Sequence, residues 1–167
     1  MSDDSHPAAS AASATSAVYE AHFARSPFQL LSGAGWKRLV AFRVDGEGVL
    51  LGGAPARYRA QTAFVPWADI TAVVVWQQRT AGSPMDYVGV RRPAGAPPLP
   101  GMNAGLGPDR TARLAPHVEH DLFLASRPVN LWRLDPRGLQ AAVDAFAPGT
   151  PVLGYEQRDA ERPGSDR

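Results

Sequence analysis

Hydrophobic and polar positions alternate over residues 39–44, where Val40, Phe42 and Val44 share one side of an extended chain. A short polar turn, DGEG, follows, and the apolar run 49–51 comes directly after it. Two short runs of this kind around a glycine-containing turn are typical of a β-hairpin. We therefore expect strands at 39–44 and 49–51.

The most apolar stretch of the chain, residues 70–77, is rich in β-branched side chains, which favours a strand. In an extended conformation it places Ile70, Ala72, Val74 and Trp76 on one face. Further strands are expected at 62–65, 87–92, 118–125 and 129–134. The pattern thus predicts seven short strands in all.

Residues 93–116 separate two of these strands and are rich in proline and glycine. Proline removes a backbone donor and fixes φ, which prevents a regular helix or an interior strand over most of the stretch. Loops of this length are uncommon inside a compact domain. We expect 93–116 to form a long, mobile loop.

A single amphipathic helix is predicted after the last strand. Asp135 is suited to cap a helix N-terminus, and Pro136 fits the first helical position, where an amide hydrogen has no partner within the helix. Apolar residues then fall at helical spacing on one face, and Pro148-Gly149 ends the element. The residues of this face are Leu139, Ala142, Val143 and Phe146.

Composition divides the chain into a domain and two flanks. Residues 1–17 are rich in alanine and serine, and residues 155–167 alternate charged and small side chains, so both are expected to be disordered tails. Residues 18–35 contain several aromatic side chains and form an ambiguous extension, because they suit either a short helix or an extended segment. The domain itself is expected to span residues 36–154.

Charge and composition exclude several classes of protein. The 167-residue chain has no cysteine, which excludes disulfides and thiolate metal sites and suits a reducing compartment, so we expect a cytoplasmic protein. Its net charge is +1, well below the basic footprint of a nucleic-acid-binding protein. The longest apolar run, residues 70–76, is far shorter than the roughly 20 residues that a membrane helix needs.

The local motifs resemble those of small bacterial pleckstrin-homology-like (PH-like) domains. The resemblance covers residues 36–153 and rests on FRVDGEGVLLGG, VPWADITAVVVWQQ, YVGVRR and VNLWRLDPRGLQAAVDAFAPGTPV. It implies a mostly β fold, a barrel or roll of seven strands in two near-orthogonal antiparallel sheets capped by one C-terminal amphipathic helix. PH-like domains share no common enzymatic activity and serve mostly as adaptors for phosphoinositide head groups, peptides or each other. The fold alone therefore does not settle the function.

We accordingly expect a non-enzymatic interaction module without a cofactor, which engages a protein partner or self-associates. Its expected contact surface lies near the strand before the long loop, at Tyr87, Arg91 and Arg92. Strands near a sheet edge present unpaired backbone groups that a partner's strand can bind.

One alternative is a membrane-surface adaptor that binds anionic lipid through a positive stripe, Lys37, Arg38 and Arg43. Phosphate recognition needs several donors that converge on one pocket. The neighbouring turn carries Asp45 and Glu47, whose carboxylates repel phosphate. This alternative is therefore less favoured than a protein partner.

Another alternative is an enzyme or a metal site at His117–Asp121, which contains two histidines and two carboxylates. On a strand, however, His117 and His120 point to opposite faces. The chain has no Gly-x-Ser-x-Gly motif and no phosphate-binding glycine loop between a strand and a helix. We expect neither a bound metal nor catalytic residues.

Overall fold

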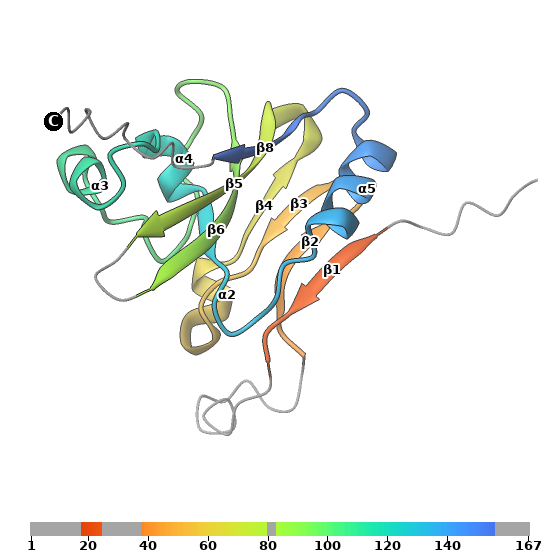
Figure 1. Cartoon of the computed structure of the whole chain (residues 1–167), viewed down its shortest axis with the longest axis horizontal. Coiled ribbons are helices and arrows are strands. Elements are labelled where there is room, and N and C mark those ends of the chain that lie inside the picture. The colour runs from red at the N-terminus through yellow and green to blue at the C-terminus, as the bar shows by residue number, and fades with distance from the viewer. Residues whose placement is uncertain (1–17, 25–37, 80–82, 156–167) are drawn as a thin grey trace, which may run out of the picture.

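The computed structural model describes residues 18–24, 38–79 and 83–155, and the first of its two sheets, sheet A, comes from the N-terminal part of the chain (Figure 1). Sheet A is an antiparallel meander in which each strand pairs with the next along the chain. The predicted hairpin is confirmed by β2 and β3, which pair around the turn at Asp45. The strands are β1 (Tyr19–His22), β2 (Val40–Val44), β3 (Gly48–Leu51) and β4 (Ala63–Pro66).

The second sheet, sheet B, has the strand order β7-β6-β5-β8. Its two long central strands, β5 and β6, pair antiparallel over their whole length, from Ala72 opposite Arg91 to Arg79 opposite Pro84. The last strand pairs parallel with β5 and sets Val152 opposite Val73. The strands are β5 (Ala72–Arg79), β6 (Pro84–Arg91), β7 (Ser126–Pro128) and β8 (Val152–Tyr155).

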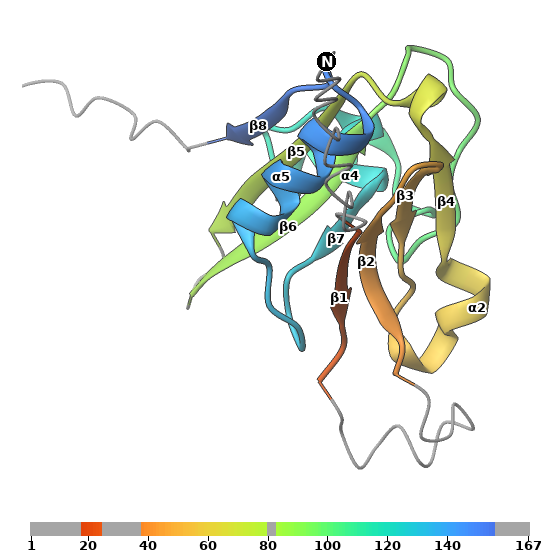
Figure 2. The same ribbon diagram turned by 90° about the vertical axis from the view of Figure 1, so that its right-hand side faces the viewer.

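The expected barrel or roll of seven strands in two antiparallel sheets is corrected in the number of strands, in closure and in direction, since β8 pairs parallel with β5. The described residues form eight strands, and no strand pairing joins sheet A to sheet B, so both sheets are open. Figure 2 shows them as separate layers that face one another. The additional strands are β1, which lies in the ambiguous extension, and β8, which ends at the first residue of the predicted tail.

The core lies between the two sheets and is closed on one side by α5 (Pro136–Phe146). The predicted helix is confirmed, since the Asp135 side chain accepts a hydrogen bond from the backbone N–H of Arg137 and Pro136 begins the first turn. Leu139 and Val143 are fully buried in the same cluster as Phe42 from sheet A. None of the helices in the described ranges is long and apolar enough to cross a membrane.

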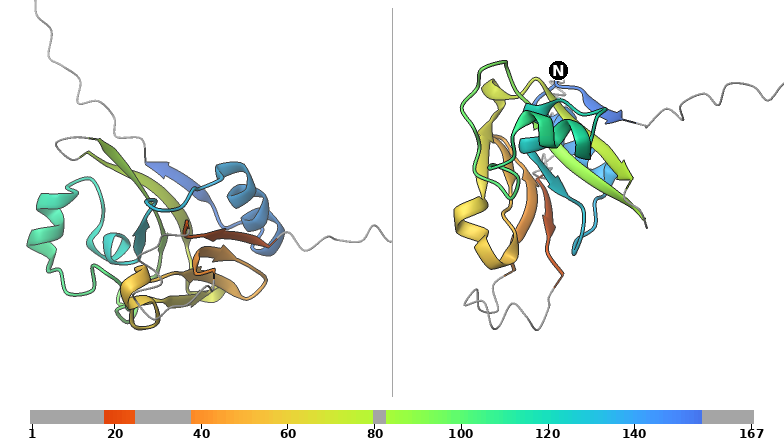
Figure 3. Two further views of the ribbon diagram at one scale, coloured as in Figure 1. Left: turned by 90° about the horizontal axis from the view of Figure 1, so that it is seen from below. Right: turned by 90° about the vertical axis from the view of Figure 1, so that its left-hand side faces the viewer.

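The expectation of a long mobile loop at 93–116 is wrong for its second half, because α3 (Pro108–Leu114) forms there. The strand predicted at 118–125 is instead α4 (His120–Leu124). The two helices lie over β5 and β6 on the side away from the main core (Figure 3). Their shared cluster contains Ala72, Val74, Trp76, Ala115, Val118, Leu122 and Phe123.

Sheet B is therefore buried on both faces, which explains why 70–77 reads as a nearly continuous apolar run. The prediction that Ala72, Val74 and Trp76 share one face is confirmed, and α4 covers this face. Ile70, predicted on the same face, belongs instead to the cluster between the sheets. The strand predicted at 129–134 is wrong, because the chain leaves the sheet after Pro128.

The close approach of β6 and β7 depends on Gly89. A Cβ atom at this position would lie 2.2 Å from the Ser126 Oγ and 2.7 Å from the carbonyl oxygen of Ala125. We expect Gly89→Ala to lower the free energy of unfolding by more than about 2 kcal/mol, measured by urea denaturation. Gly105→Ala is the control, since a Cβ there meets nothing within 4 Å. Equal urea midpoints for the two variants would contradict this reading of the β6–β7 contact.

Three short helical turns complete the described chain. The turns η1 (Pro55–Arg57) and α2 (Tyr58–Gln61) connect β3 to β4, and η2 (Trp67–Asp69) connects β4 to β5. The Tyr58 hydroxyl donates a 2.8 Å hydrogen bond to the carbonyl oxygen of Val40, which fixes α2 against β2. The β3–β4 connection is thereby held at one end of sheet A.

Candidate functional site

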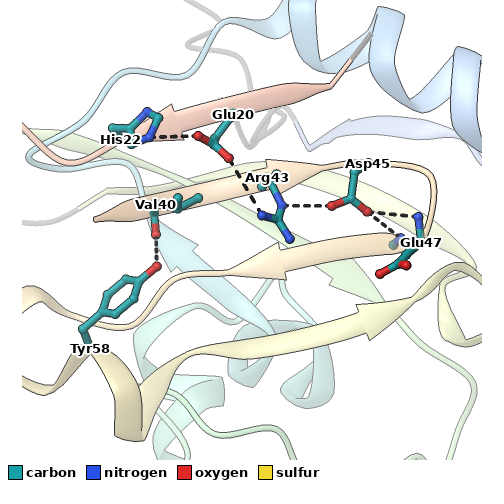
Figure 4. A network of polar contacts seen from close by, with 8 residues as sticks. Glu20, His22, Val40, Arg43, Asp45, Glu47 and Tyr58 are labelled. Atoms are coloured by element: carbon teal, nitrogen blue, oxygen red, sulfur yellow. Dashed lines mark hydrogen bonds and ion pairs between the residues drawn. The ribbon is translucent and has the colours of Figure 1, made fainter. Parts of the chain in front are cut away.

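Of the positive stripe predicted on the first hairpin, Arg43 is paired with neighbouring carboxylates (Figure 4). Arg43 Nε lies 2.9 Å from Asp45 Oδ2, and Arg43 Nη1 lies 4.0 Å from Glu20 on β1. Arg38 is exposed, and Lys37 lies outside the described residues. The contact of Arg43 with Glu20 was not predicted, because β1 was not predicted as a strand and the register that sets Glu20 opposite Arg43 was not foreseeable.

The second predicted surface, Tyr87, Arg91 and Arg92, is engaged in contacts within the domain. Tyr87 stacks on Trp76 with ring centroids 4.2 Å apart, and burial raises the pKa of its hydroxyl. Arg91 pairs with Glu119 at 3.2 Å through two nitrogens, and Arg92 donates to the carbonyl oxygen of Pro97 at 2.7 Å. These residues hold the 93–125 segment against sheet B.

The histidines of the 117–121 run have separate partners. His117 Nε2 donates to the carbonyl oxygen of Gln77 at 3.1 Å, whereas His120 Nδ1 lies 2.9 Å from the Thr111 hydroxyl. Among the described residues, no three histidine, aspartate or glutamate side chains are grouped so that they could hold a metal ion. The two histidines thus connect the 117–121 segment to β5 and α3.

A pocket of about 100 Å³ opens at the end of sheet A where β1 and β3 finish. Its lining comes from distant parts of the sequence: the end of β1, the β3–β4 connection, the 93–107 segment and the residues in and after β7. The surface that it presents is mostly apolar. The lining residues are Phe23, Gly52, Ala54, Pro55, Met102, Arg127, Pro128, Asn130 and Leu131.

Leu131 and Met102 form an exposed apolar rim around this pocket. The Leu131 side chain is 62% exposed and that of Met102 is 41% exposed. Leu131 also has a φ of 55°, in the left-handed region that residues other than glycine rarely adopt. A hydrogen bond of 2.6 Å from the backbone N–H of Ala24 to the Leu131 carbonyl oxygen holds it there. A large apolar side chain thus projects into solvent from a strained backbone position.

Arg127 forms the buried polar part of the pocket wall and is only 3% exposed. Its Nε donates to the carbonyl oxygen of Gly52 at 3.0 Å, and Nη2 donates to those of Gln61 at 3.1 Å and Pro100 at 2.7 Å. Nη1 donates to the carbonyl oxygens of Ser126 and, at 3.5 Å, Leu124. The guanidinium therefore joins sheet A, β7 and the 93–107 segment.

The charge of Arg127 is stabilised by carbonyl dipoles alone, since no ion pair to a carboxylate is found for it within the described ranges. Burial lowers the pKa of Arg127 to about 10, so the group stays protonated at neutral pH. The described residues that line the pocket include no aspartate or glutamate. The wall of an apolar pocket thus carries one positive charge that has no carboxylate partner among the described residues.

Sequence reasoning missed this pocket because its residues come from segments that only the fold brings together. The sequence placed Arg127 between two predicted strands and Leu131 within the second of them. The one local signal is Pro128, the last residue of β7, because proline disfavours the continuation of a strand beyond it. No family model, curated protein or solved structure that we compared with the chain matches it.

Proposed function

We propose that the chain is a non-enzymatic, cytoplasmic PH-like module that binds a protein partner through the pocket beside Leu131. The order of elements supports the PH-like assignment. Four strands build sheet A, the next three build most of sheet B, and α5 follows β7, as the resemblance implies. The fold closes one side of the core with α5 and leaves the pocket at the end where β1 and β3 finish.

The size of the pocket favours a single anchoring side chain as its occupant. Sites for drug-sized ligands and cofactors have volumes of roughly 300–1,000 Å³, several times larger than this one. Apolar cavities of about 150 Å³ accept a group the size of benzene. A pocket of about 100 Å³ therefore suits one aliphatic side chain of a larger partner.

The observation that carries the proposal is the exposed apolar rim. Interface anchors insert into pockets whose surroundings exclude water from the contact. Leu131 and Met102 supply such surroundings. Leu131 keeps an unfavourable backbone conformation although its exposed side chain gains little from packing within the domain. By comparison, the pairing of Arg43 with Asp45 and Glu20 favours a protein partner over an anionic lipid surface.

The test is affinity capture of the tagged full chain from its native cytoplasm, followed by mass spectrometry, with Leu131→Asp beside the unchanged protein. A charge on the rim is expected to reduce recovery of the partner at least tenfold. Leu114→Asp is the matched control, because Leu114 is 43% exposed but lies on α3 outside the pocket lining. If the partner is a second copy of this chain, light scattering of the purified protein shows a dimer.

Leu131→Gly separates binding from stability in the same assay. Glycine adopts a φ of 55° without strain, so this variant is expected to unfold at the same urea concentration as the unchanged protein or a higher one. It nevertheless removes the rim side chain and should weaken capture. Equal recovery from all variants, with a monomer in solution, would rule out the pocket as the binding site.

A further inference from the structure

The positive charge of Arg127 in the pocket wall limits the kinds of chemical group that the pocket is expected to bind. Arg127 is buried, and none of the described residues that line the pocket supplies a carboxylate to balance it. Its N–H groups all donate to carbonyl oxygens. An incoming anion is therefore attracted by the charge of Arg127 without a direct hydrogen bond to it. Charges attract more strongly in a poorly hydrated pocket than in water. An occupant with a negative group near its apolar part is therefore favoured.

A direct hydrogen-bond donor is available beside this charge. Asn130 lines the pocket and is exposed, and its side-chain amide makes no hydrogen bond to any described residue. The amide carries two N–H donors, which suit a carboxylate oxygen. Arg127 and Asn130 thus offer a positive field and free donors at the same pocket.

We infer that the pocket binds the last residue of a partner chain, with its aliphatic side chain inside and its α-carboxylate beside Asn130 and Arg127. This inference rests on the proposed function and specifies the part of the partner that is recognised. A C-terminal residue combines one apolar group with one anion at short separation. An internal residue of the partner supplies the apolar group without the charge.

The probe is a pair of synthetic hexapeptides of glycine and serine that end in leucine, one with a free carboxylate and one with a C-terminal amide. Binding to the isotope-labelled full chain is followed by NMR titration. A charge-assisted hydrogen bond is roughly twice as strong as a neutral one. We expect the free carboxylate to bind about tenfold more tightly than the amide.

Asn130→Asp tests the placement of the carboxylate without changing the size of the side chain. It puts a negative charge where the peptide carboxylate is expected, so it should abolish the preference for the free acid. Ala141→Asp is the matched control, because it adds the same charge at an exposed position of α5 outside the pocket lining. The control is expected to keep the preference.

Equal affinities for the two peptides would overturn the inference and leave the proposed function standing. A preference that persists in Asn130→Asp would also overturn it, because the carboxylate would then lie elsewhere. Failure of both peptides to bind counts against C-terminal recognition, whereas the capture experiment with Leu131→Asp decides the proposed function independently.

Discussion

Replacing Arg127 by methionine is expected to lower the free energy of unfolding by about 3–5 kcal/mol. Methionine fills much of the space of the aliphatic stem but donates no hydrogen bonds. The buried carbonyl oxygen of Gly52 then loses its donor, and the partly buried carbonyl oxygens of Gln61 and Pro100 lose theirs as well. A loss of this size is a large fraction of the 5–15 kcal/mol that stabilises a typical domain.

Urea denaturation of the full chain measures this loss. Arg127→Lys keeps the charge but has fewer and differently directed donors, so its stability should fall between those of the unchanged protein and Arg127→Met. The control is Arg133→Met, which removes an exposed arginine that lies outside the pocket lining. If Arg127→Met were no less stable than Arg133→Met, the guanidinium would not be what joins the two sheets and the 93–107 segment.

Truncation of Trp76 to alanine is expected to cost about 3–5 kcal/mol, the usual range for a buried aromatic residue. Trp76 is 1% exposed and stacks between sheet B and α4, against Tyr87 and Phe123. Its Nε1 donates to the Ser126 Oγ at 3.0 Å, and that hydroxyl donates to the Leu122 carbonyl oxygen at 2.7 Å. The indole thus anchors α4 through both packing and hydrogen bonding.

Trp76→Phe separates these two contributions. Phenylalanine keeps most of the apolar contact but has no N–H, so we expect it to lose only about 1–2 kcal/mol. Hydrogen exchange should show faster exchange of the α4 amides in Trp76→Ala than in Trp76→Phe. Similar losses in both variants would mean that the hydrogen bond, rather than the packing, secures α4.

The elements predicted correctly are those whose signals are local. Asp135-Pro136 marks the start of α5, and its apolar face repeats at helical spacing, so no knowledge of the rest of the fold is needed. The β2–β3 hairpin likewise follows from alternation around a short turn, in which Asp45 accepts from the N–H groups of Glu47 and Gly48.

The helix α3 was missed because proline and glycine dominated the interpretation of 93–116. Only part of the signature that located α5 is present at α3, where Pro108 occupies the first turn but the N-cap is Gly107, without a capping side chain. At α4 the short apolar run was assigned to a strand, although Leu122 and Phe123 are buried from a helix of five residues. Short apolar runs do not distinguish the two structures by periodicity.

The candidate site was not predictable for a different reason. Arg127 gains its role from carbonyl groups that belong to three other segments, and none of these groups has a sequence signature. The residues that were selected, such as Arg43 and Arg91, are charged side chains near strands, and the fold gives each of them a carboxylate partner.

The parallel pairing of β8 with β5 also constrains the order in which the domain is able to fold. Val73 pairs with Val152, which follows it only after β6, β7 and the whole of α5. Sheet A is complete by Pro66 and consists of neighbouring strands, so its contacts form between nearby residues. Contacts between residues far apart in the sequence slow folding. During synthesis, sheet A is therefore available early, whereas one edge of β5 remains unpaired until the last described strand emerges from the ribosome.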